Sequence, residues 1–226
     1  MTERAWRPRA IVFDMDGTLL DTETLALRAW QEAAAAVGAT FESDLARTLI
    51  GRNFADCSSR LRAHFDAHHY PVDEVLGGWH ASYEALVERE GIVVKDGASE
   101  LLGWIRAAGI PCAVATTTRR ERARSKLRDA GLLGHFVTVI GGDDVTHGKP
   151  APDIYYAAAA ALGVAAKDCL AIEDSEPGFR AAYAAGMTTI LVPDLIVPQA
   201  GLLELSPHIL DSLADVQRYL AALVSP

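Results

Sequence analysis

A run of four apolar residues, Ala10–Phe13, leads directly into the sequence Asp14-Met15-Asp16-Gly17. A continuous apolar run that ends at a turn signal is typical of a strand buried on both faces, as in a parallel sheet. Gly17 allows the backbone to turn sharply, so the two carboxylates can face the same small volume. We therefore expect this strand to bring both acids to the carboxyl edge of a sheet, where open α/β folds bind ligands.

Two neighbouring carboxylates repel each other, so a cation between them is needed to keep both ionised. Mg²⁺ suits such a place because it prefers oxygen, takes few protein ligands and keeps water and substrate phosphate in its shell. The structural alternative is a plain turn, in which Asp and Gly only end a strand. A motif this short is a hypothesis, so the rest of the chain has to decide between the two.

Helical and strand patterns alternate after residue 95. The expected strands are 112–115, 136–140, 169–172 and 188–192, and the helices that precede them are 98–108, 121–130, 154–162 and 178–185, with a last helix at 213–224. Strands that alternate with helices of this length predict βαβ units and a mainly parallel sheet.

Residues 22–91 show only helical patterns, at 22–37, 43–50, 53–68 and 72–90. Such a block reads as an insertion that follows the first strand. We therefore predict an α/β fold, with a Rossmann-like parallel sheet core formed by residues 1–21 and 92–226 and an inserted all-helical cap domain at residues 22–91.

The later strands also end in polar residues of particular types. Thr116 follows the second expected strand, Lys149 lies between turn formers in a loop after the third, and Glu173-Asp174 ends the fourth. Each has a structural explanation, as a helix cap, a solvated loop charge or an acidic helix start. Together with the first acidic pair they supply carboxylates for a metal, plus a hydroxyl and an ammonium for an anion.

In this combination the chain resembles the haloacid dehalogenase-like superfamily, in its branch of phosphatases and phosphomutases with a helical cap. The matching segments occur in the family's order and span nearly the whole chain: Asp14-Met15-Asp16-Gly17-Thr18, Thr116, Gly148-Lys149-Pro150 and Glu173-Asp174-Ser175. The resemblance implies a role for each position: Asp14 as the nucleophile that forms an aspartyl-phosphate, Asp16 as general acid and base, Thr116 and Lys149 as phosphate ligands, and Asp174 as a metal ligand with Glu173 beside it.

The chemistry of the residues agrees with these roles. A carboxylate that attacks a phosphate dianion meets repulsion, which Mg²⁺ and Lys149 would neutralise. Because the Asp16 side chain would handle protons, we expect its backbone carbonyl to reach the metal. Backbone amides near Thr117 are candidates to bind phosphate oxygens. The cap loop 51–53 resembles the family's specificity loop, so Arg52 and Asn53 are candidate substrate contacts, with a plain interhelical turn as the alternative.

Departures from the family's sequence patterns exclude or disfavour some of the activities found in the family. Residues 1–94 contain no lysine, which excludes a Schiff-base phosphonate hydrolase. Ala26 and Phe54 stand where the resemblance to β-phosphoglucomutase would place a cap histidine and a cap arginine, and Thr18 stands in place of its valine. We therefore expect a phosphomonoester hydrolase whose substrate is a sugar phosphate. A phosphomutase stays as an alternative, as does a non-catalytic phospho-acceptor module of the receiver type.

Composition limits the partners. A formal charge of −9 disfavours nucleic acid or an anionic membrane surface, and no apolar run suits a signal peptide or a membrane span. The three cysteines are odd in number and far apart, as in a reduced, cytoplasmic protein. We expect a small phosphorylated metabolite as the partner and a monomer as the default state.

Overall fold

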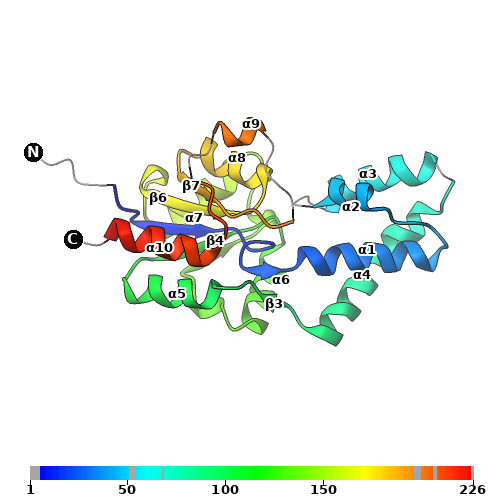
Figure 1. Cartoon of the computed structure of the whole chain (residues 1–226), viewed down its shortest axis with the longest axis horizontal. Coiled ribbons are helices and arrows are strands. Elements are labelled where there is room, and N and C mark those ends of the chain that lie inside the picture. The colour runs from blue at the N-terminus through cyan, green and yellow to red at the C-terminus, as the bar shows by residue number, and fades with distance from the viewer. Residues whose placement is uncertain (1–5, 51–53, 68, 196–199, 206–207, 225–226) are drawn as a thin grey trace, which may run out of the picture. The chain divides into compact units, whose positions relative to one another are not determined.

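The computed structural model describes residues 6–50, 54–67, 69–195, 200–205 and 208–224 (Figure 1). The chain divides into two compact units: Met1–Leu20 with Val94–Pro226, and Asp21–Val93. The two passages of the chain between the units carry β2 (Leu20–Asp21) and β3 (Val93–Val94), which pair as a two-stranded sheet. Within the described ranges, no helix has the length and apolar character needed to span a membrane.

A five-stranded sheet forms the centre of the first unit. Its strands are β1 (Ala10–Phe13), β4 (Cys112–Ala115), β5 (Thr138–Ile140), β6 (Cys169–Glu173) and β7 (Thr188–Leu191), in the spatial order β5-β4-β1-β6-β7. Every pairing in this sheet is parallel. All residues of β1, β4 and β6 are buried, as expected for strands covered on both faces.

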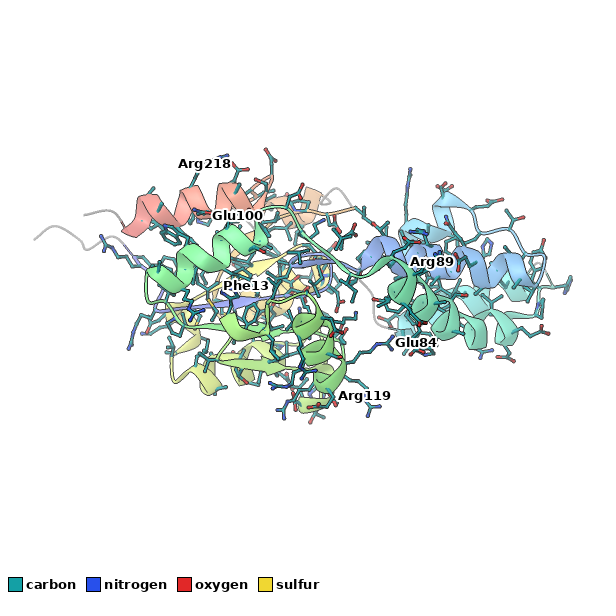
Figure 2. The ribbon with its side chains drawn as sticks, turned by 90° about the horizontal axis from the view of Figure 1, so that it is seen from below. Phe13, Glu84, Arg89, Glu100, Arg119 and Arg218 are labelled. Atoms are coloured by element: carbon teal, nitrogen blue, oxygen red, sulfur yellow. The ribbon has the colours of Figure 1, made fainter. Side chains whose placement is uncertain are left out.

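Helices of the first unit follow the strands in alternation. They are α5 (Ala98–Ala107), α6 (Arg120–Asp129), α7 (Asp153–Leu162), α8 (Glu176–Ala184), α9 (Ala200–Leu203) and α10 (Leu213–Val224), with 3-10 turns at Leu133–His135, Gly142–Asp144 and Ala166–Asp168. Phe13 lies in the interior of this unit, whereas Glu100 of α5 and Arg218 of α10 lie on its outer helices (Figure 2).

Small side chains join α7 and α8 to one face of the sheet. Alternate residues of three strands, including Ala10, Val12 and Ala113, share a buried cluster with Ala158 of α7 and Ala181 of α8. Alanines let helix and sheet backbones approach closely, which fixes the start of each helix relative to the strand ends.

The second unit consists of α1 (Glu23–Ala36), α2 (Ser43–Leu49), α3 (Phe54–Ala67) and α4 (Val72–Glu90). Its core contains Leu61 and Phe65 of α3 and an aromatic stack in which Trp30 lies 4.9 Å from Trp79 between ring centroids. The Trp79 indole donates a hydrogen bond to the backbone carbonyl of Ala26, at 3.1 Å. The predicted fold class, a parallel α/β sheet with an inserted helical block, is confirmed.

Parallel pairing brings the carboxyl ends of three strands together. Phe13 of β1 lies beside Val114 of β4 and Ile172 of β6, so the residues that follow these strands share one edge. The amide of Asp14 donates to the carbonyl of Ile172 at 2.9 Å, which extends the ladder by one residue beyond β1. This edge carries Asp14, Thr116 and Asp174, which directly follow these three strands.

Candidate active site

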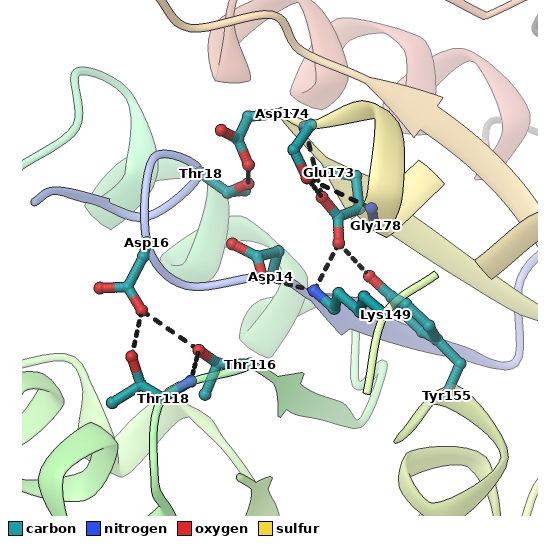
Figure 3. Close-up of polar contacts among 11 residues, drawn as sticks. Asp14, Asp16, Thr18, Thr116, Thr118, Lys149, Tyr155, Glu173, Asp174 and Gly178 are labelled. Atoms are coloured by element: carbon teal, nitrogen blue, oxygen red, sulfur yellow. Dashed lines mark hydrogen bonds and ion pairs between the residues drawn. The ribbon is translucent and has the colours of Figure 1, made fainter. Parts of the chain in front are cut away.

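Lys149 lies between two carboxylates at the end of the central strands (Figure 3). Its Nζ donates to Oδ1 of Asp14 at 2.5 Å and to Oε1 of Glu173 at 2.5 Å. The side chain of Lys149 is only 4% exposed, and that of Glu173 is fully buried. Charge-assisted hydrogen bonds of this length hold the ammonium in one place.

Glu173 is fixed from several sides. Its Oε1 also accepts a 2.5 Å hydrogen bond from the hydroxyl of buried Tyr155, and its Oε2 accepts one at 3.1 Å from Ser175 Oγ. The ammonium of Lys149 lies 5.2 Å from the centroid of the Tyr155 ring. In addition, Gly178 packs so closely that a Cβ there would lie 1.9 Å from Oε1 of Glu173. Hydrogen bonds and close packing therefore hold the Glu173 carboxylate in one position.

Asp174 contacts the two residues that follow Asp16 in the first acidic segment, Gly17 and Thr18. Thr18 Oγ1 donates to its Oδ1 at 3.1 Å, and a Cβ on Gly17 would lie 2.4 Å from its Oδ2. Gly17 has φ of 92°, a left-handed conformation that favours glycine. Both the turn and the close approach of Asp174 therefore require glycine at position 17.

Three carboxylates gather at this edge with one buried lysine. Ligand atoms of Asp14, Glu173 and Asp174 lie within 4.8 Å of one another. Burial raises the pKa of Asp14 well above its usual value, and Lys149 offsets this only in part. Burial would lower the pKa of Lys149, but the carboxylates of Asp14 and Glu173 outweigh it, so that pKa is raised. The excess of negative charge and the oxygen donors fit a divalent cation such as Mg²⁺.

The carboxylate of Asp16 belongs to a different group of contacts (Figure 3). Its Oδ2 accepts hydrogen bonds from Thr116 Oγ1 at 3.2 Å and from Thr118 Oγ1 at 2.7 Å. Its Oδ1 accepts one at 2.7 Å from Nζ of Lys126, on α6. The amide of Thr118 also donates to Thr116 Oγ1, at 3.1 Å. The two aspartates of the motif thus have separate partners: Asp14 contacts the lysine of a late loop, and Asp16 the segment after β4.

The structure therefore brings together six of the residues singled out from sequence, in two adjoining sets: Asp14, Lys149, Glu173 and Asp174, and Asp16 with Thr116. The side chain of Thr117 is exposed. Arg52 and Asn53 lie outside the described residues.

Sequence reasoning assigned no site role to five side chains that contact this group, although two of them stand in the matching segments: Thr18, Thr118, Lys126, Tyr155 and Ser175. Two of them carried a usable signal. Ser175 adjoins the acidic pair at a helix start, where its hydroxyl accepts from the amide of Gly178. Lys126 follows Ala123 by three residues, so it shares the apolar face of its helix.

Comparison with known proteins shows which family the chain belongs to. Protein CbbY of Cupriavidus necator is 35% identical over 219 residues, which cover 90% of this chain and 86% of that protein. Hexitol phosphatase A of Escherichia coli is 35% identical over 186 residues, with 82% and 83% of the two chains covered. A crystal structure of CbbY from Rhodobacter sphaeroides in complex with phosphate has a TM-score of 0.73 at 32% identity and covers 92% of this chain and 96% of that one. A family model described as haloacid dehalogenase-like hydrolase matches residues 8–186, and the chain therefore belongs to this family.

Proposed function

We propose that the chain is a Mg²⁺-dependent phosphatase that hydrolyses a small phosphomonoester through an aspartyl-phosphate on Asp14. A hydrolase of phosphoric monoesters is what the family and its named phosphatases support. The observation that carries the proposal is the pairing of Asp14 with buried Lys149 inside a cluster of three carboxylates, while Asp16 has its own set of donors.

The reaction would proceed in two steps. In the first, a carboxylate oxygen of Asp14 attacks phosphorus, the bond from phosphorus to the ester oxygen breaks, and Asp16 gives that oxygen a proton, so an alcohol leaves. In the second, Asp16 takes a proton from water, the water oxygen bonds to phosphorus, and the bond to Asp14 breaks, so phosphate leaves. Two carboxylates are needed because one forms a bond while the other moves the proton.

Charge neutralisation would come from the surrounding residues. Lys149 and the hydroxyl of Thr116 would bind phosphoryl oxygens, with backbone amides near Thr117 as further donors. Asp14 and Asp174 would hold Mg²⁺ through carboxylates, and Asp16 through its backbone carbonyl. When bound, the metal would reduce the repulsion between the phosphoryl group and the attacking carboxylate.

Glu173 has a less direct role in this scheme. Its Oε1 already accepts from Lys149 and Tyr155, and its Oε2 accepts from Ser175. We therefore infer that Glu173 fixes the ammonium of Lys149, and that its carboxylate, which lies within the three-acid cluster, would help to hold the metal.

A sugar phosphate is the substrate class that we propose. Hexitol phosphatase A supports it by name, and the residues Arg52 and Asn53 of the cap, which spans residues 22–91, are the proposed contacts to the sugar. The catalytic domain would be formed by residues 1–21 and 92–226, and the cap would supply specificity by closing over it in a monomer.

Phosphate release from p-nitrophenyl phosphate and from a panel of sugar phosphates tests the proposal. We expect release to require Mg²⁺, to stop with EDTA, and to be lost in Asp14→Asn. The matched control, Asp211→Asn, removes an exposed aspartate and should leave turnover unchanged. Borohydride reduction of acid-quenched enzyme should convert residue 14 to homoserine, which mass spectrometry detects.

The same assays separate the alternatives. Turnover that survives Asp14→Asn would exclude Asp14 as the nucleophile. Isomerised sugar phosphate that accumulates faster than free phosphate would identify a mutase. A stable phosphoprotein without turnover would identify a phospho-acceptor module.

A further inference from the structure

Lys126 occupies an unusual place for a lysine. In α6 the buried residues are Ala123 and Leu127, and Lys126 lies between them in sequence, three residues after the first. Its side chain is only 11% exposed, in a helix otherwise rich in exposed charge. An ammonium removed from water is costly unless an anion compensates for it. That anion is Asp16, whose Oδ1 lies 2.7 Å from the Lys126 Nζ.

The contacts of Asp16 determine where its carboxylate points. Lys126 binds Oδ1, whereas Thr118 and Thr116 bind Oδ2 at 2.7 Å and 3.2 Å. Donors on both oxygens fix the rotation of the carboxylate as well as its position. Two of these donors come from the segment after β4 and one from α6, so the hold on Asp16 depends on how α6 packs.

Thr116 cannot serve Asp16 and a phosphoryl group with the same proton. Its hydroxyl has one hydrogen, which now points to Oδ2 of Asp16. If that hydroxyl instead donates to a phosphoryl oxygen, as the proposed function requires, Asp16 loses the 3.2 Å hydrogen bond. Thr118 and Lys126 would then carry the orientation of the carboxylate during the reaction.

We propose that Lys126, assisted by Thr118, is a positioning residue that holds the carboxylate of Asp16 for proton transfer to the leaving oxygen. This inference rests on the proposed function, because it assigns Asp16 that transfer. In this role Lys126 acts through its contact with Asp16. Its loss should therefore impair proton donation and leave phosphate binding intact.

A series of esters with different leaving groups tests this directly. p-Nitrophenyl phosphate releases a stable anion that needs little protonation, whereas phenyl and benzyl phosphate release progressively more basic oxygens. In Lys126→Met, we expect kcat/KM to fall about tenfold for benzyl phosphate, as for a weakened general acid, and less than about threefold for p-nitrophenyl phosphate. kcat/KM is the appropriate quantity because it reports steps only up to release of the alcohol.

Companion variants distinguish positioning from stability. Lys126→Arg keeps the charge and should recover part of the loss on benzyl phosphate, and Thr118→Val should show the same leaving-group trend more weakly. Asp16→Asn should show it more strongly. Arg128→Met, which removes an exposed cation from the same helix, should leave all three esters unaffected. Calorimetric binding of inorganic phosphate in the presence of Mg²⁺ should be unchanged in Lys126→Met.

Three outcomes would overturn the inference. Equal losses on all esters in Lys126→Met would indicate a general structural role. Loss of phosphate binding would make Lys126 a ligand instead. Wild-type protein that hydrolyses none of the esters or sugar phosphates would refute the proposed function itself, which the first two outcomes do not.

Discussion

Gly178 gives the sharpest test of how the acidic site is built. A Cβ at this position would lie 1.9, 2.0 and 2.1 Å from Oε1, Cδ and Oε2 of Glu173. Real Cβ contacts essentially never fall below 3.0 Å, and the helix backbone on one side and a buried strand on the other leave little room to yield. In Gly178→Ala the carboxylate must therefore move by about 1 Å or more.

That displacement has a cost which the contacts set. Glu173 is fully buried and accepts 2.5 Å hydrogen bonds from Lys149 and Tyr155, which a shift of about 1 Å would stretch to the limit of hydrogen bonding. Breaking a buried ion pair costs about 3–5 kcal/mol. The lower end applies here because Lys149 keeps its hydrogen bond to Asp14. Alanine also restricts the unfolded chain more than glycine does, which stabilises the folded protein by about 0.4–1 kcal/mol. The net loss should be about 2–3 kcal/mol.

Thermal and urea unfolding, followed by circular dichroism, measure this loss. For a chain of this size, about 2–3 kcal/mol corresponds to a fall in Tm of roughly 4–12 °C. Gly103→Ala is the matched control, since Gly103 is exposed within α5 and has no neighbour within 4 Å of the added Cβ. The control should stabilise the protein by about 0.5–1 kcal/mol.

A double-mutant cycle identifies the contact responsible. In a Glu173→Ala background the carboxylate is absent, so Gly178→Ala should cost almost nothing or become mildly stabilising. An equal cost of Gly178→Ala in both backgrounds would refute the reasoning, because the loss would then arise elsewhere in α8.

Three further predictions concern the metal, the cysteines and the second unit. Mg²⁺ at about 100 times its Kd should stabilise the wild type by about 2.7 kcal/mol relative to EDTA, and an equal gain in Asp174→Asn would count against that residue as a ligand. Burial raises the pKa of the Cys112 thiol to about 12 and that of Cys169 to about 11, so both stay protonated and should resist iodoacetamide at about pH 8 until the protein is denatured, as peptide mass spectrometry can show. Leu61→Ala, in the fully buried core of the helical unit, should cost about 2–5 kcal/mol in urea unfolding, and an unchanged midpoint would contradict this packing.

Short elements were the least predictable part of the fold. The strand expected at 136–140 is present only as β5, from Thr138, because a 3-10 turn at Leu133–His135 precedes it and the exposed Val137 makes one backbone bond to Cys112. The pair β2 and β3 was not expected, since two-residue strands carry no periodicity.

Local sequence by itself determined the sheet and the chemistry of its edge. Continuous apolar runs required buried parallel strands, and the residues directly after them, Asp14, Thr116 and Asp174, had to share that edge because parallel strands end together. The turn at Gly17 was also predictable from the sequence, because a sharp turn of this kind requires a residue that tolerates positive φ.

Only the tertiary structure decided which side chains hold these residues in place. Tyr155 reaches Glu173 from α7, and Lys126 reaches Asp16 from α6, at sequence separations of 18 and 110 residues. No local pattern encodes such distances, because they depend on the angle and depth at which each helix packs on the sheet. The sequence thus placed charged groups at one edge of the sheet. Helix packing then divided them into two sets of contacts, one that joins Asp14 to the buried Lys149 and one that joins Asp16 to Lys126 and the threonines after β4.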